Sequence, residues 1–102
     1  MDAQLKEKID NLVREHKVFI FMKGQKGAPQ CTFSSVADAI LQRVGADYES
    51  YNVLEDPEMR QGIKDYSDWP TIPQLYINGE FVGGSDIMQE LFESGELKSM
   101  IQ

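Results

Sequence analysis

Apolar residues recur every three or four positions in four stretches of the chain, and this spacing predicts four amphipathic helices. The first helix covers residues 3–15. The second starts at Phe33 and carries its apolar stripe as far as Val44. In the third helix, the expected inward-facing residues are Ile63 and Tyr66. In the fourth helix, they are Ile87, Leu91 and Phe92.

Capping residues indicate where the later helices begin and end. Asp56 can cap the third helix, with Pro57 at its first position, where proline is well tolerated. We expect Ser85 or Asp86 to cap the fourth helix. Gly95 should end that helix before a short tail helix.

The segments between the helices have the patterns of strands. Residues 18–22, "VFIFM", form a continuous apolar run that predicts a strand buried on both faces. Residues 48–53, "YESYNV", predict a second strand, and "QLYINGEFVGG" predicts a hairpin around the turn dipeptide Asn78-Gly79. A strand, a crossover helix and a strand make a parallel unit, to which the hairpin adds two antiparallel strands. The sequence therefore predicts an α/β, thioredoxin-like fold with a four-stranded mixed β-sheet flanked by helices on both faces.

Composition and charge narrow the classes of protein to which the chain can belong. Its 102 residues, 41% of them hydrophobic, suit one domain that spans residues 1–102. The net charge of −7 argues against a nucleic-acid surface, because a polyanion would be repelled. No stretch resembles a membrane-spanning helix, and the charged N-terminus lacks the apolar core of a signal peptide. We therefore expect a soluble protein with no nucleic-acid or membrane partner.

Cys31 is the single cysteine of the chain, so it has no internal disulfide partner, and an active thiol would need a reducing compartment. It falls between the loop "KGQKGAP" and a helix start, where unpaired backbone N–H groups and the helix dipole favour the thiolate. Lys23, at the end of the preceding strand, would act in the same direction. A lone free cysteine is usually a small buried apolar residue. The proline-preceded helix start argues for a reactive thiol instead, because that position is exposed and electropositive.

Two loops give weaker signals. Thr71-Ile72-Pro73 precedes a strand, where a cis peptide bond could present backbone groups outward. Gly83-Gly84 leads into the helix start at Ser85-Asp86, which could bind an anion such as a carboxylate. Taken alone, the two loops are better explained as a rigid turn and as an ordinary capped helix.

Set side by side, the segments "FMKG", "PQCTFS", "NVLEDPEMRQGIKDYSDWPTIPQLYINGEFVGGSDI" and "GEL" closely resemble the monothiol glutaredoxins, from about residue 5 to residue 101. The resemblance implies a thioredoxin fold and a glutathione site. It also implies a [2Fe–2S] cluster that bridges two protomers, each supplying one cysteine thiolate and one bound glutathione thiolate. The protein would then be a homodimer with the cluster and a monomer without it. Its partners would be glutathione and iron–sulfur client or assembly proteins.

The resemblance also assigns roles to individual residues. Cys31 is implied as the reactive thiol and the cluster ligand. The implied glutathione site consists of Lys23, Phe33, Arg60, Ile72, Pro73, Ser85 and Asp86. Lys23 and Arg60 would face the glycyl carboxylate, while Asp86 and the helix start at Ser85 would hold the γ-glutamyl end. The backbone of Ile72, before an expected cis-Pro73, would pair with the tripeptide as an added strand does. Phe33 would line the pocket near the sulfur.

The chain departs from the family at two positions. The usual signature is Cys-Gly-Phe-Ser, and here Thr32 puts a branched side chain beside the sulfur, where glycine allows close approach. Ser85 stands where many relatives have cysteine. This removes any resolving thiol and leaves glutathione itself as the available thiol partner.

Three functions remain open from the sequence. The leading one is an iron–sulfur carrier that accepts a [2Fe–2S] cluster as a glutathione-bridged homodimer and passes it to apo targets. The second is a glutathione-dependent thiol–disulfide oxidoreductase that deglutathionylates proteins with Cys31 as sole nucleophile, so enzymatic activity is an open question. The third is a redox-regulatory adaptor. The expected location is a bacterial cytoplasm, or a mitochondrial matrix, plastid or cytosol if a transit peptide has been removed.

Overall fold

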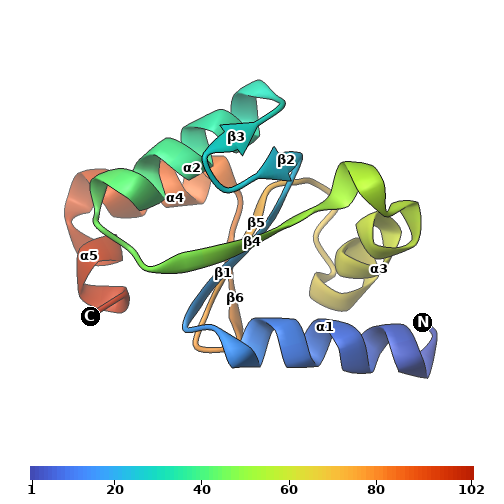
Figure 1. Ribbon diagram of the computed structural model, residues 1–102. Helices are drawn as coiled ribbons and strands as arrows, with labels where there is room; N and C mark the ends of the chain where they lie inside the picture. Colours follow the sequence, from blue (N-terminus) through green and yellow to red (C-terminus); the bar gives the residue numbers. More distant parts are fainter.

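The computed structural model describes residues 1–102, and its centre is a four-stranded sheet in the order β4-β1-β5-β6 (Figure 1). The strands of this sheet are β1 (Val18–Met22), β4 (Tyr48–Asn52), β5 (Gln74–Ile77) and β6 (Glu80–Gly83). The helices are α1 (Ala3–Glu15), α2 (Thr32–Arg43), α3 (Pro57–Ser67), α4 (Ser85–Ser94) and α5 (Glu96–Met100), with a 3-10 turn, η1 (Val53–Glu55), before α3. A separate hairpin of β2 (Gly24–Gln25) and β3 (Ala28–Pro29) follows β1.

The sheet is mixed, as the sequence predicted. β1 runs parallel to β4 and antiparallel to β5, and β6 returns antiparallel to β5. Asn78 and Gly79, at the turn between β5 and β6, have φ angles of 53° and 80°. These are left-handed values that asparagine and glycine adopt more readily than other residues. The predicted thioredoxin-like fold is therefore confirmed.

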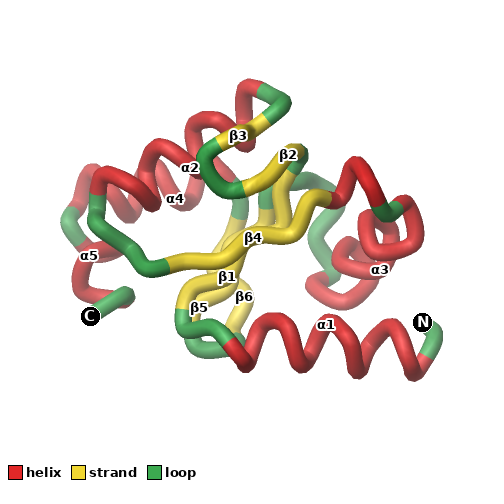
Figure 2. The backbone as a smooth tube through the Cα atoms, viewed as in Figure 1, coloured by secondary structure: helices red, strands yellow, loops and turns green.

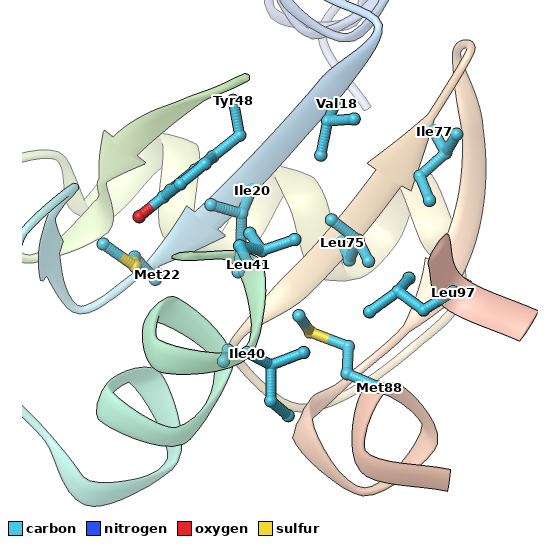
Figure 3. Close-up of a cluster of buried hydrophobic side chains, with 11 residues drawn as sticks. Val18, Ile20, Met22, Ile40, Leu41, Tyr48, Leu75, Ile77, Met88 and Leu97 are labelled. Carbon is cyan, nitrogen blue, oxygen red and sulfur yellow. The ribbon is translucent and has the colours of Figure 1, made fainter. Parts of the chain in front are cut away.

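Helices cover both faces of the sheet, and each face has its own hydrophobic core. On one face, α2, α4 and α5 pack over β1 and β5, with Ile20, Leu75 and Met88 among the buried side chains (Figure 3). On the other face, α1 and α3 pack over Phe21 and Tyr76. Side chains alternate between faces along a strand, so β1 supplies residues to both cores and is buried along its whole length.

Chain segments from three strands of the sheet meet at one of its ends (Figure 2). In the strand register, Gln74 at the start of β5 pairs with Phe21 near the end of β1, and Leu75 pairs with Gly83 at the end of β6. The segments after β1, before β5 and after β6 therefore leave the sheet at the same end. Because neighbouring strands lie about 5 Å apart, these segments span only about 10 Å.

Three details of the fold differ from the sequence-based expectations. The segment expected as a plain loop after Lys23 contains the β2–β3 hairpin. The N-cap of α4 is Gly84, whose extended backbone places Ser85 and Asp86 already inside the first turn, so neither side chain caps the helix. The expected buried stripe of α4, Ile87, Leu91 and Phe92, is only half-buried, and the fully buried residue of the helix is Met88, which was not among the residues expected from the sequence. No helix of the fold has both the length and the apolar character needed to cross a lipid bilayer.

Candidate functional site

Cys31 is the N-cap of α2, and its thiol is free and half-buried. Its backbone is extended, with φ −150° and ψ 159°, which directs the sulfur to the open N–H groups of the first helical turn. The backbone N–H of Ser34 donates to Sγ at 3.4 Å, and the Ser34 hydroxyl oxygen lies 3.5 Å from Sγ. Sulfur thus takes the capping position that a serine or aspartate oxygen commonly occupies.

The surroundings of Cys31 favour its thiolate form. Burial raises the pKa of the thiol. Four effects lower it and together outweigh burial: hydrogen bonds from the Ser34 side chain, the Ser34 backbone and the Phe33 backbone, and the positive charge of Lys23. The net effect places the pKa of Cys31 below its ordinary value. The hydrogen-bond donors and the Lys23 charge each stabilise the thiolate anion more than the neutral thiol. The reactive thiolate predicted at this helix start is thus consistent with the local geometry.

Lys23 is fixed to the turn that contains Cys31 by two hydrogen bonds. Its backbone N–H donates to Oγ of Ser34 at 3.0 Å, and its carbonyl accepts from the backbone N–H of Gln30 at 2.9 Å. Ser34 is fully buried. Its hydroxyl oxygen contacts both the Lys23 N–H, just after β1, and the sulfur of Cys31, so one atom links the end of this strand to the cysteine. Sequence reasoning overlooked Ser34, because a serine one turn into a helix is usually an ordinary surface residue.

A cavity of about 390 Å³ lies at the same end of the sheet. This is within the usual size range of small-ligand pockets. Its lining residues are Lys23, Phe33, Arg60, Lys64, Trp69, Pro70, Thr71, Ile72, Pro73, Gly84, Ser85, Asp86 and Ile87. All seven residues that the resemblance implied for glutathione line this one cavity. Cys31 does not line it, but Phe33 and Lys23 connect the cavity to the cysteine turn.

Charged groups enter the cavity from different elements. Lys23 follows β1, and Arg60 and Lys64 lie one turn apart on α3, which packs on the α1 face of the sheet. Ser85 and Asp86 begin α4, which packs on the opposite face. No side chain caps the α4 N-terminus, so its first N–H groups remain available as donors to an anion. The cavity therefore combines three cations with one carboxylate and a helix start.

The wall between these charged groups is the segment before β5. The Ile72–Pro73 peptide bond is cis, as the sequence suggested. Ile72 makes no backbone hydrogen bond outside the sheet and helices, so its N–H and carbonyl remain unpaired. A Cβ placed on Gly84 would lie 3.2 Å from the carbonyl oxygen of Pro73, so glycine lets the start of α4 approach this wall closely. The unpaired backbone edge can accept an extended peptide.

The fold and the site together define a thioredoxin-like protein with one accessible thiol at a helix start beside a charged pocket. Residues 18–82 match the family described as Glutaredoxin. A monothiol glutaredoxin of Synechocystis sp., ycf64-like, is 56% identical over 102 residues, which cover 100% of this chain and 95% of that protein. The chain belongs to the glutaredoxin family, and its high-identity relatives are monothiol glutaredoxins.

Solved structures agree with this assignment. The solution structure of reduced poplar apo GrxS14 has a TM-score of 0.82 and 54% sequence identity, and the match covers 93% of this chain and 87% of that one. The crystal structure of a buckwheat glutaredoxin–glutathione complex has a TM-score of 0.84 at 21% identity, covering 96% of this chain and 87% of that one. At this identity the buckwheat protein supports the shared fold alone.

Proposed function

We propose that this chain is a monothiol glutaredoxin that binds glutathione in the cavity at the end of its sheet, next to Cys31. The observation that carries this proposal is the cavity itself, which is lined by Lys23 just after β1, by cations of α3, by the start of α4 and by Ile72 with its unpaired backbone. Glutathione is a short peptide with a carboxylate at one end and an amino acid zwitterion at the other. The charges of the cavity match this distribution.

Each part of the peptide has a partner in the cavity. Lys23 and Arg60 bind the glycyl carboxylate, and Lys64 adds positive charge on the same helix. Ile72 pairs with the central residue through its free backbone groups. At the other end, Asp86 binds the γ-glutamyl amino group, and the N–H groups at the start of α4 bind its carboxylate. This orientation brings the glutathione sulfur to the side of the cavity where Phe33 lies.

The cargo of the protein is a [2Fe–2S] cluster, carried between two copies of the chain and passed to iron–sulfur client or assembly proteins. Such clusters are commonly held by four thiolates. Cys31 and one bound glutathione supply two of them per copy, so two copies complete the set. The thiolate character of Cys31 supports this role, as does the 61% exposure of Phe33 beside it, which leaves the cysteine turn open to a second copy.

A thiol–disulfide exchange activity is the second candidate, and the lowered pKa of the half-buried Cys31 favours it. The thiolate attacks the glutathione sulfur of a protein–glutathione mixed disulfide. The disulfide bond breaks, and the protein thiolate leaves and takes up a proton. A second glutathione thiolate then attacks the Cys31–glutathione disulfide, which forms glutathione disulfide and restores the Cys31 thiolate.

One purification separates the two candidates. The protein is purified without oxygen in the presence of glutathione, and its visible absorbance and its size are measured. A brown dimer that loses its colour in the Cys31→Ser variant supports the carrier. A colourless monomer that releases glutathione from a glutathionylated protein supports the exchange enzyme. A colourless monomer without that activity would contradict both.

A further inference from the structure

Gln74, the first residue of β5, is a polar side chain with 0% of its surface exposed. Its amide nitrogen Nε2 donates to the carbonyl oxygen of Trp69 at 3.1 Å and to that of Thr71 at 3.2 Å. A primary amide has two N–H donors, and here they reach carbonyls on either side of Pro70. Gln74 therefore bridges the segment that forms the cavity wall ahead of the cis proline.

Tyr76 sets the orientation of this amide. Its hydroxyl donates to Oε1 of Gln74 at 3.2 Å, and both side chains are buried on the same face of β5. Burial raises the pKa of Tyr76, so the hydroxyl keeps its proton and stays a donor. The tyrosine ring packs edge-on against Phe21 and Phe81, with centroid distances of 5.7 and 5.5 Å. With Oε1 held by Tyr76, the nitrogen of the amide faces the wall segment.

Few other hydrogen bonds hold the wall segment in place, although Ile72 packs against the core on the α1–α3 face and the Trp69 ring packs against Phe81. Trp69 is anchored by its own N–H, which donates to the Lys64 carbonyl and the Ser67 hydroxyl. Beyond it, Pro70, Thr71 and Ile72 make no backbone hydrogen bond outside helices and strands. The hydrogen bonds from Gln74 are thus the main polar restraint on the residues between Trp69 and β5.

We propose that Gln74 is a positioning residue for glutathione: it holds the carbonyls of Trp69 and Thr71 so that the backbone of Ile72 is preorganised to pair with the peptide. The inference rests on the proposed function of the cavity. If a binding segment is mobile, part of the binding free energy is lost in ordering it. The apparent affinity is then the intrinsic affinity multiplied by the fraction of molecules in which the segment already has the binding conformation. Gln74 lies on the α1–α3 face of the sheet, whereas α2 packs on the other face, so the Cys31 thiol should not depend on it.

The test compares Gln74→Met with Val13→Ala. Methionine keeps the length of the side chain but removes both donors, while Val13→Ala trims a buried residue of the same core far from the cavity. Order parameters of the Thr71 and Ile72 amides are measured by NMR without ligand. Glutathione dissociation constants and the Cys31 pKa are then measured for each variant. Val13→Ala serves as a control for a general loss of stability.

For Gln74→Met we expect order parameters at Thr71 and Ile72 to fall from about 0.85 to below about 0.6. The glutathione dissociation constant should rise about tenfold, with the Cys31 pKa unchanged. Val13→Ala should change none of these. Unchanged order parameters, or a mobile wall with unchanged affinity, would overturn the positioning role. Failure of the wild-type protein to bind glutathione would instead overturn the proposed function, while the order parameters would still decide whether Gln74 holds the wall.

Discussion

The backbone N–H of Lys23 donates to Oγ of Ser34 at 3.0 Å, and the same oxygen lies 3.5 Å from the sulfur of Cys31. A residue of the cavity and the Cys31 thiol thus share one buried hydroxyl group. Because the Lys23 N–H occupies one lone pair of that oxygen, the hydroxyl proton is free to point toward the sulfur when the cysteine is a thiolate. Ser34 therefore couples the position of Lys23 to the acidity of Cys31.

Ser34→Ala should raise the pKa of the Cys31 thiol, because the variant removes a hydrogen bond that favours the thiolate. The pH dependence of alkylation by iodoacetamide reports this pKa directly. Ser35→Ala is the matched control, because Ser35 is the exposed neighbour of Ser34 and its side chain makes no hydrogen bond. An alkylation midpoint that stays the same in both variants would show that the Ser34 hydroxyl does not stabilise the thiolate.

Folding stability should depend on pH through Cys31. Its pKa is lower in the folded protein than in the unfolded chain, so the folded state binds the thiol proton less tightly. The stabilisation is fully present above the ordinary thiol pKa and is lost as the pH falls through the folded-state pKa. Relative to Cys31→Ser, wild-type protein should therefore gain stability as the pH rises across this range. Urea unfolding at several pH values measures the difference, and a constant or falling difference would contradict the lowered pKa.

Cys31→Ser should abolish both cluster binding and deglutathionylation without disturbing the fold. The chain has no second cysteine to replace the ligand, and serine is a favourable N-cap whose oxygen can accept from the Ser34 N–H. Anaerobic reconstitution followed by visible absorbance tests the first point, and circular dichroism tests the fold. A variant that still acquires the chromophore would rule out Cys31 as the ligand.

Lys23→Ala and Arg60→Ala should each weaken glutathione binding by about ten- to a hundredfold, which corresponds to roughly 1.5–3 kcal/mol for a charge-assisted contact that is partly desolvated. Both side chains are half-buried, so solvent screening places the expected effect toward the lower end. Asp86→Ala should act similarly at the other end of the peptide. Calorimetry measures the affinities, with Lys98→Ala on α5 as an exposed control for the change in net charge. Equal affinities in all of these variants would place the site elsewhere.

Thr32→Gly should lengthen the life of the cluster-bound dimer without improving glutathione affinity. Thr32 is the exposed first residue of α2, next to Cys31, so its side chain would occur twice where two copies meet around one cluster. A β-branched side chain has little freedom to turn aside. Glycine at this helix position should also destabilise the apo fold by about 0.5–1 kcal/mol.

The effects of Thr32→Gly on apo stability and on cluster lifetime are measured in separate experiments. Thermal unfolding of the apo protein should show a slightly lower midpoint. Loss of visible absorbance in air, at matched glutathione concentration, should be slower than in wild-type protein. Equal or faster loss would show that threonine is accommodated at the dimer contact.

Local patterns in the sequence determined the elements and the class of fold. The unbroken apolar run of residues 18–22 predicted a strand buried on both faces, and β1 is that strand. Asn78-Gly79 predicted a tight hairpin because few other residues accept its φ angles. Asp56 was predicted as an N-cap, and its side chain accepts from the backbone N–H of Met59. These features depend on neighbours only a few residues away, so periodicity and capping rules are sufficient to find them.

The family resemblance of the sequence named seven residues that line the cavity, but how these residues come together was decided by tertiary structure. Pairing of Phe21 with Gln74 and of Leu75 with Gly83 brings segments far apart in the chain to one end of the sheet. Helical periodicity does not reveal that Ser34 is buried against the sulfur, because that burial depends on where β1 ends relative to α2. The sequence likewise does not predict the two carbonyls to which Gln74 donates. The hydrogen-bond partners of a polar residue at the start of a strand are set by how the preceding loop folds back over it.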